Sequence, residues 1–326
     1  MVYHEIALEP ESIEDLKDLG LLDRMFGFEH GRLIAVFPAK PKESGSWGKL
    51  LLRHLRATLP LEKHIEIGIR IEQMLPKLMW RSRNSSKLEN GQEWFDLATK
   101  EHDTDGKSFA CLIGKGEREH PDWVPFQKLY APDNSVPACL SGPVHFGDAM
   151  KDPKTFLAEL EPLLFSANRI SFIDPHFNPV HPDKENSDRW RETAKKLADS
   201  FIQAGRLTAD ISFHTGYDRE VSAKFVSADA FVQSIATKIS RFFPATTTLS
   251  VTAWSKKRHG IPFHARYLIT DKAGVALDYG SDLGVNRRTD VALIPLEFAK
   301  KRLREFEKST ESPFEWKASV KVHDRR

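Results

Sequence analysis

The stretch HARYLITD (His264–Asp271) decides how this chain is interpreted, together with GSD (Gly280–Asp282) and TDV (Thr289–Val291) further along. These segments bring an imidazole, a guanidinium, carboxylates and a small Gly-Ser turn close together in the sequence. An imidazole can attack phosphorus, and a guanidinium can hold phosphate oxygens. The combination therefore predicts a site that acts on a phosphodiester.

Two apolar runs in this region predict short strands, Tyr267–Ile269 and Gly274–Tyr279, because turn residues bound each of them. Alternate residues of a strand share one face. We therefore expect His264 and Arg266 to project from the same face of one strand.

Upstream of the motif, the apolar pattern alternates between helical and extended periods. It predicts helices at 156–165, 190–204 and 230–243 and strands at 169–174, 209–213 and 247–253. Strands that alternate with helices imply crossover connections and a largely parallel or mixed sheet covered on both faces. The predicted fold class is α/β, with a mixed sheet flanked by helices.

The N-terminal part differs in texture and suggests a separate α/β or α+β region. It predicts a strand at 33–37, helices at 47–59 and 66–80, and a polar stretch at 101–107. The segment 130–143 carries three prolines with Asn, Ser and Gly, which favours a connection between two halves. We predict a recognition or regulatory region at 1–137 and a motif-bearing domain at 138–326.

Composition excludes several classes of protein. The 326 residues are 40% hydrophobic, enough for a buried core, but no segment approaches the ~20 apolar residues needed to span a bilayer. Cys111 and Cys139 form no CxxC pair, so a reducing cytoplasm is expected. His176 and His181 lack the spacing of a metal motif, and neither a metal nor another cofactor is predicted.

Basic residues flank the motif although the net charge is only +2. The two groups are Lys256, Lys257 and Arg258 before it and Arg287 and Arg288 after it. If the sheet brings both groups beside His264, they could guide a polyanion into the site, so nucleic acid is the predicted partner. The alternative is a solvated basic surface, which we favour for the later run at 300–304.

The motif resembles that of the phospholipase D superfamily, H-x-K-x-x-x-x-D followed by G-S-x-N and then an acidic residue. The matching positions are His264, Asp271, Gly280, Ser281 and Asp290. Arg266 replaces the usual lysine, and Leu283 replaces the usual asparagine. The resemblance covers roughly residues 143–301 and implies a phospholipase D-like mixed sheet.

The resemblance also implies a mechanism without a metal, and a phosphodiesterase that acts as a nuclease on DNA or RNA. His264 would attack phosphorus and form a phosphohistidine, while Asp290 supports its imidazole. Arg266 and Ser281 would stabilise the phosphoryl oxygens, and Asp271 completes the motif.

This family draws a second histidine from a second copy of the motif, and one convincing copy is present here. A homodimer or a related subunit is therefore expected to supply it. The H-x-R sequence at His30–Arg32, which precedes an apolar run, is an alternative within the chain. Asp174 and His176 follow another predicted strand and are secondary candidates near the same sheet edge.

Each candidate also has an ordinary structural explanation. His264 could be a hydrogen-bonded histidine at a strand entrance, Arg266 could pair with Asp271, and Asp271 could cap a turn. The changes at Arg266 and Leu283 leave a second interpretation open beside the phosphodiesterase. In it, the chain is a catalytically degenerate subunit that binds nucleic acid or joins a larger complex.

Overall fold

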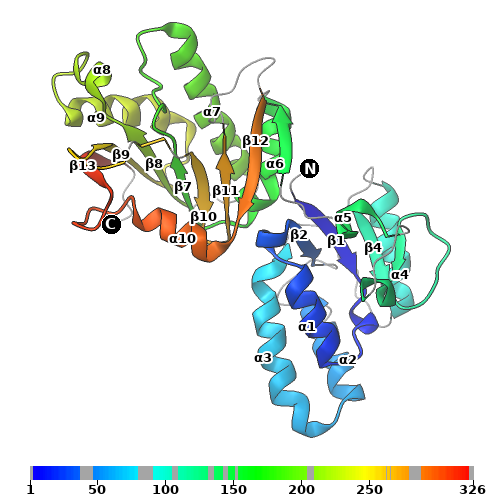
Figure 1. Cartoon of the computed structure of the whole chain (residues 1–326). Helices are drawn as coiled ribbons and strands as arrows, with labels where there is room; N and C mark the ends of the chain where they lie inside the picture. The colour runs from blue at the N-terminus through cyan, green and yellow to red at the C-terminus, as the bar shows by residue number, and fades with distance from the viewer. Residues whose placement is uncertain are drawn as a thin grey trace. The chain divides into compact units, whose positions relative to one another are not determined.

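The chain divides into two compact units, Tyr3–Val144 and His145–Arg326. The computed structural model describes residues 3–36, 47–79, 91–104, 109–130, 136–141, 146–150, 153–203, 209–261, 263–264, 266–278 and 288–322. One sheet is parallel and the other is mixed, and helices accompany both. The predicted α/β class is confirmed (Figure 1).

The N-terminal unit contains a parallel sheet with the strand order β3-β2-β1-β4-β5. Its elements are β1 (His4–Leu8), α1 (Leu16–Met25), β2 (Arg32–Ala35), α2 (Trp47–Thr58), α3 (His64–Met74), β3 (Leu78–Met79), α4 (Gly91–Thr104), β4 (Cys111–Gly114), β5 (Trp123–Pro125) and α5 (Ala138–Ser141). Alternate residues of β1 enter two cores. Ile6 packs in a core that includes Leu51 and Ile67, whereas Ala7 packs in one that includes Trp94. Helices therefore cover both faces, as a parallel sheet requires.

Helix α5 belongs to the N-terminal unit, so the boundary lies beyond the predicted position after Pro137. Leu140 is buried in the core that contains β1, and the carbonyl of Cys139 accepts a hydrogen bond from Arg32 Nε at 2.8 Å. The H-x-R sequence at His30–Arg32 thus uses its guanidinium to hold α5. This contact is structural.

The C-terminal unit contains an eight-stranded mixed sheet with the order β13-β9-β8-β7-β10-β11-β12-β6. Its elements are β6 (Phe146–Met150), α6 (Pro153–Ser166), β7 (Arg169–Ile173), α7 (Lys184–Gln203), β8 (Asp210–Gly216), α8 (Arg219–Ser222), α9 (Ala228–Ile239), β9 (Thr248–Lys256), β10 (Tyr267–Thr270), β11 (Gly274–Leu277), β12 (Arg288–Ile294), α10 (Leu296–Arg304) and β13 (Phe314–Val322). Strands β7, β8 and β9 run parallel, and β10 pairs antiparallel with β7. The carboxyl ends of the three parallel strands and the start of β10 therefore share one edge.

The two faces of this sheet bury different side chains. Phe172 of β7 contacts Phe177 and Phe213, whereas the next residue, Ile173, lies in the core that contains Ala299 of α10. The alternation follows from the pleat of the strand, in which successive side chains point to opposite faces. Both faces are covered, so the open edge at the strand ends is where polar side chains can gather.

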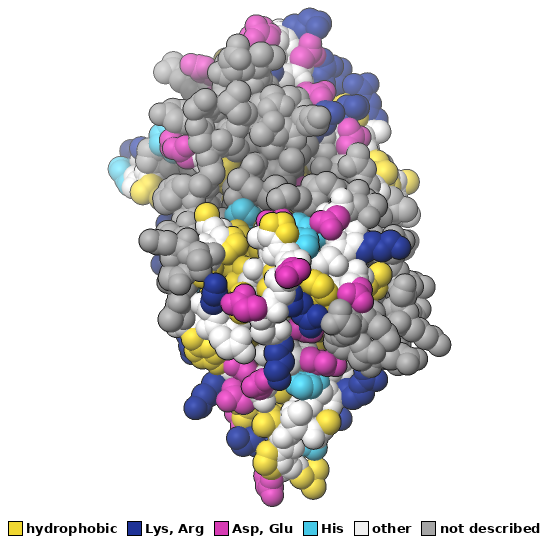
Figure 2. Space-filling view, turned by 90° about the vertical axis from the view of Figure 1, so that its right-hand side faces the viewer, with side chains coloured by type: hydrophobic (Ala, Val, Ile, Leu, Met, Phe, Trp, Pro, Cys, Tyr) yellow, Lys and Arg dark blue, Asp and Glu magenta, His cyan; other side chains and the backbone are white. Residues whose placement is uncertain are grey.

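The distribution of charged and apolar side chains on the surface does not by itself indicate a function. No helix in the described part of the chain is both long and apolar enough to cross a bilayer. Figure 2 shows Lys and Arg side chains interspersed with Asp and Glu side chains on one face. This mixture agrees with the small net charge of +2.

Candidate active site

Polar side chains gather at the edge where β7, β8 and β9 end. Two neighbouring cavities lie there, and we name them the Arg266 cavity and the His264 cavity. Pro175, His176, Gly216 and Asp218 line both cavities. Because open α/β sheets bind ligands at the carboxyl ends of their strands, this edge is the natural place for a site.

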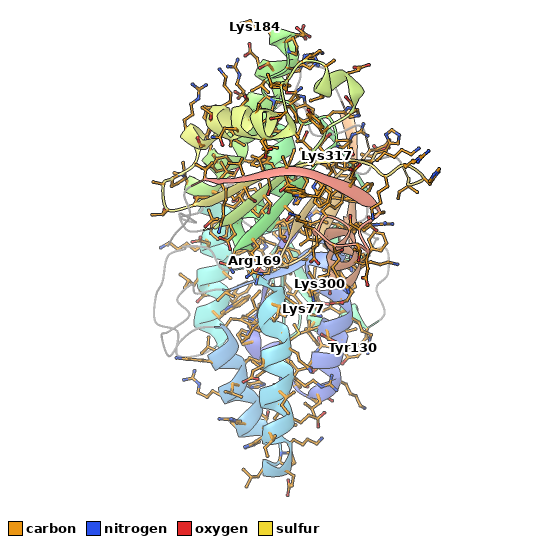
Figure 3. The ribbon with its side chains drawn as sticks, turned by 90° about the vertical axis from the view of Figure 1, so that its left-hand side faces the viewer. Lys77, Tyr130, Arg169, Lys184, Lys300 and Lys317 are labelled. Atoms are coloured by element: carbon orange, nitrogen blue, oxygen red, sulfur yellow. The ribbon has the colours of Figure 1, made fainter. Side chains whose placement is uncertain are left out.

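The His264 cavity, of about 620 Å³, holds the histidine at the centre of the motif. Besides the shared residues, it is lined by Tyr217, Trp254, Ser255, Lys256, Phe263, His264, Glu315 and Lys317. The side chain of His264 is exposed, and Lys317, which lies on β13 (Figure 3), lines the same cavity. Accessible imidazole, ammonium groups and aromatic rings therefore meet in one space.

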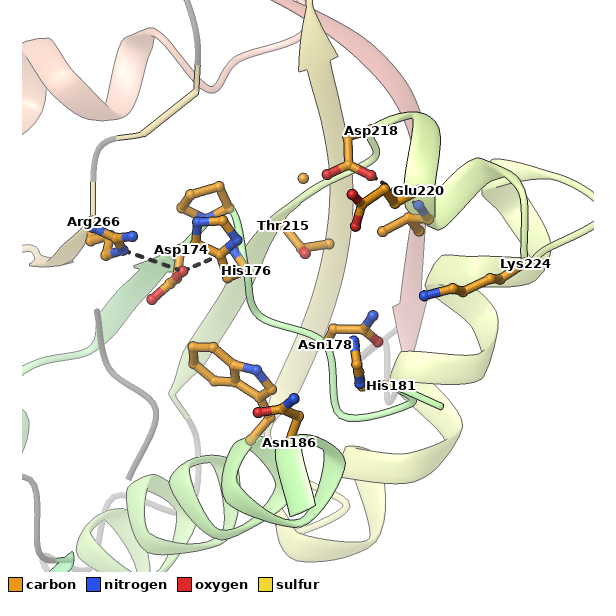
Figure 4. Close-up of a pocket in the computed structure, with 14 residues that line it drawn as sticks. Asp174, His176, Asn178, His181, Asn186, Thr215, Asp218, Glu220, Lys224 and Arg266 are labelled. Carbon is orange, nitrogen blue, oxygen red and sulfur yellow. Dashed lines mark hydrogen bonds and ion pairs between the residues drawn. The ribbon is translucent and has the colours of Figure 1, made fainter. Parts of the chain in front are cut away.

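The Arg266 cavity, of about 320 Å³, holds the guanidinium of the motif. Its other principal polar residues are Asp174, Asn178, His181, Asn186, Glu220 and Lys224. Figure 4 shows Arg266, Asp174 and His176 together on one side and Asp218, Glu220 and Lys224 on the other. Positive and negative groups are thus mixed in this cavity.

Asp174 connects the groups on the side of Arg266. It is fully buried, and its Oδ1 lies 3.9 Å from Arg266 Nε and accepts the backbone N–H of His176 at 2.9 Å. Arg266 Nη1 also donates to the carbonyl of Asp278 at 2.7 Å. The guanidinium is therefore oriented by the protein on two sides, which both fixes its position and occupies part of its hydrogen-bonding capacity.

The predicted placement of His264 and Arg266 on one strand is wrong. Strand β10 begins at Tyr267, where it pairs with Ile173, so both residues lie in the connection before it. They line different cavities, which share the segment Pro175–His176. The structure therefore brings the two residues to one edge without placing them on one face.

Asp271 lies at the other end of β10 from His264. Its Oδ1 accepts the backbone N–H groups of Asn168 at 2.8 Å and Arg169 at 3.2 Å. Four strand residues at about 3.3 Å each separate it from the edge that carries the cavities. The predicted catalytic role of Asp271 has no support in this placement, whereas its alternative role at a turn does. Its predicted structural partner was also wrong, because Arg266 pairs with Asp174.

We expect Asp271→Asn to lower the free energy of unfolding by roughly 1 kcal/mol at pH 7 and to leave activity per folded molecule unchanged. Burial would raise the pKa of Asp271, but hydrogen bonds from Asn168 and Arg169 and the charge of Lys272 leave it below its ordinary value of 3.8. The charged carboxylate thus stabilises the fold above that value, and the contribution is lost as the pH falls through the lower folded pKa. Urea unfolding at pH 7 and at acidic pH tests this, since the difference between wild type and variant should shrink with acidification.

The other two motif residues with a predicted catalytic role are Asp290 and Ser281. Asp290 is exposed on β12, which lies two strands away from β10 in the sheet. It lines neither the His264 cavity nor the Arg266 cavity. Its carbonyl accepts the N–H of Asp278 at 3.2 Å. Ser281 lies outside the described residues, so its predicted contact with phosphoryl oxygens is still a prediction.

The two basic groups do not converge on His264 as expected. Lys256 ends β9 and lines the His264 cavity, but Lys257 Nζ donates to the carbonyls of Thr310 and Ser312. Lys257 therefore stabilises the loop that contains Thr310 and Ser312. Strands β9 and β12 are five steps apart in the sheet, or about 24 Å at the usual spacing.

The other predicted basic residues contribute less. Arg258 is exposed but lines neither cavity. Arg288 begins β12, on the distant side of the sheet, and Arg287 lies outside the described residues. Lys317, which was not predicted, lines the His264 cavity together with Lys256 and pairs there with Glu315 at 2.8 Å.

A second polar cluster lies in the N-terminal unit and was not predicted. Among the described residues, His102, Asp103 and His120 have metal-ligating atoms within 4.8 Å of one another. Both Nδ1 atoms accept backbone N–H groups, from Phe109 and Asp122, so each Nε2 carries a proton that it can donate to a carboxylate. Metal binding at Nε2 would move those protons to Nδ1, where they would face N–H donors. The cluster is therefore better suited to hydrogen bonding than to a metal.

Comparisons with known proteins give no family. No protein-family model and no curated protein matches the chain. Among solved structures, the chain is similar to TrmBL2, an archaeal chromatin protein described as showing a novel mode of DNA binding. That match covers 78% of this chain and 84% of the other at 14% identity, with a TM-score of 0.27. At this level the likeness carries no argument about fold or function.

Proposed function

We propose that the C-terminal unit is a metal-independent phosphodiesterase that cleaves nucleic acid, with His264 as its nucleophile. The observation that carries the proposal is the exposed imidazole of His264 in a cavity of about 620 Å³ that also contains Lys256 and Lys317. The motif around His264, which resembles that of the phospholipase D superfamily, supplies the reaction type.

The cavity suits a polyanionic substrate with bases. The ammonium group of Lys256 can attract phosphates, that of Lys317 lies in the same cavity paired with Glu315 at 2.8 Å, and aromatic rings such as that of Tyr217 offer a surface for stacking. Arg266, in the adjoining cavity, would hold phosphoryl oxygens as charge develops on them. Attack by His264 would form a covalent N–P bond and expel one nucleoside oxygen.

A specific observation favours a second function, binding of nucleic acid without cleavage. Arg266 is already engaged with Asp174 and with the carbonyl of Asp278, and it stands where the motif usually has lysine. A guanidinium held in this way would bind phosphate less freely than a lysine does. The alternative predicts salt-dependent association with no product.

Incubation of the purified chain with end-labelled DNA and RNA in excess EDTA tests the proposal. We expect cleavage of at least one of these polymers, because no step requires a divalent cation. Cleavage that appears only after addition of Mg²⁺ or Mn²⁺ would contradict the metal-independent mechanism. Binding without cleavage under both conditions would support the noncatalytic alternative.

A further inference from the structure

Two imidazoles share the His264 cavity. His176 follows β7 and His264 precedes β10, and these strands are neighbours in the sheet. Both histidine side chains are exposed. Two exposed histidines of one chain therefore line the same cavity.

Backbone hydrogen bonds to β8 fix the start of the connection that carries His176. The N–H of Asp174 donates to the carbonyl of His214 at 3.0 Å, and the N–H of Gly216 donates to the carbonyl of Pro175 at 3.0 Å. A Cβ on Gly216 would lie 2.6 Å from that Pro175 oxygen, so only glycine permits this close approach. The Asp174 carboxylate fixes the N–H of His176 as described above. These contacts fix the backbone position of His176 at the edge of the cavity.

The chemistry of the proposed reaction calls for an acid at this place. Attack on a nucleotide phosphodiester expels an alkoxide, which is a poor leaving group unless it receives a proton as the P–O bond breaks. A histidine suits this role because imidazole changes protonation state near neutral pH. His176 is the second exposed histidine that lines the cavity of the nucleophile.

We propose that His176 is the general acid and base that works with His264 in the same chain, an inference that rests on the proposed function. A nitrogen of His264 attacks phosphorus, the P–O bond to the leaving nucleoside breaks, and the His176 imidazolium gives its proton to that oxygen. Neutral His176 then takes a proton from water as the water oxygen attacks phosphorus. The N–P bond breaks, so both histidines return to their starting states with a phosphomonoester and an alcohol as products.

A nucleoside p-nitrophenyl phosphodiester separates the two roles, because p-nitrophenolate leaves without a proton. We expect His176→Ala to release about one nitrophenolate per chain in a rapid burst and then to stall with phosphohistidine at His264, since hydrolysis lacks its base. With an oligonucleotide, the same variant should be slower than wild type by about 10²- to 10⁴-fold. His264→Ala should show neither burst nor cleavage.

His259→Ala is the matched control. His259 is an exposed histidine of the same unit that lines neither cavity. Its removal should leave both substrates cleaved at the wild-type rate. If wild type cleaves neither substrate, the proposed function itself fails. If wild type cleaves both and His176→Ala matches it, or gives no burst while folded, the role of His176 alone is overturned.

Mixing distinguishes a histidine within the chain from one in a partner copy. With a tenfold excess of the His264→Ala variant, activity should stay proportional to the wild-type chain present, because each wild-type chain has both histidines. If two copies of His264 formed each site, mixed dimers would be inactive and the activity would collapse. That collapse would contradict the assignment of His176.

Discussion

Replacing His264 with alanine is expected to abolish EDTA-resistant cleavage, with a loss on the order of 10⁴-fold or more, because it removes the proposed nucleophile of the covalent step. The side chain is exposed, so its removal should change the free energy of unfolding by less than about 0.5 kcal/mol. Single-turnover cleavage of a labelled oligonucleotide and urea unfolding measure the two quantities separately.

His259→Ala provides the control for this substitution. His259 is exposed in the same connection between β9 and β10, but it lines neither cavity. The two variants therefore remove equivalent groups at similar exposure, and we expect His259→Ala to retain wild-type cleavage. Equal activity in both variants would show that the imidazole of His264 takes no part in the reaction.

Most strands of the C-terminal unit could be predicted from the sequence because buried and less buried residues alternate along them. In β9, Leu249, Val251 and Ala253 are buried while the residues between them are less so, and this alternation marked the strand in advance. The start of β10 at Tyr267 was also predicted correctly. The error was to extend the alternation of strand faces back to His264 and Arg266, which precede the strand.

The composition of the site was harder to predict. Asp174 and His176 had a local signal, because Asp-Pro-His directly follows a predicted strand. Asp218 and Glu220 had none, since they reach the cavities only because β8 pairs in parallel with β7. Arg266 satisfied the motif, but its ion pair with Asp174 depends on the same long-range arrangement. Spacing within one segment cannot reveal such partners.

Burial of His214 predicts a large loss of stability on acidification. This residue lies on β8 and lines neither cavity; its Nδ1 accepts the indole N–H of Trp254 at 3.1 Å and its ring contacts Phe306. Burial lowers its pKa from 6.5 to about 4. Protonation of Nδ1 would also place two N–H donors face to face, so the folded state holds the neutral imidazole.

The direction of the effect follows from proton binding. Between about pH 6.5 and pH 4, the unfolded chain protonates this histidine while the folded chain does not. The stability is therefore fully present above pH 6.5 and is lost progressively as the pH falls toward 4. A shift of this size corresponds to something on the order of 3 kcal/mol, a large part of the stability of an ordinary domain.

His214→Gln isolates this contribution, because an amide oxygen can accept the Trp254 indole N–H and does not titrate in this range. We expect wild type to lose more free energy of unfolding than the variant between pH 7.5 and pH 4.5, as measured by urea titration followed by tryptophan fluorescence. Other titrating groups act in both proteins, so they cancel in the comparison. Parallel pH profiles would mean that His214 takes up a proton in the folded state at little cost. Because the carbonyl of His214 holds Asp174, a diverging profile would also predict that mild acid loosens the connection that carries His176.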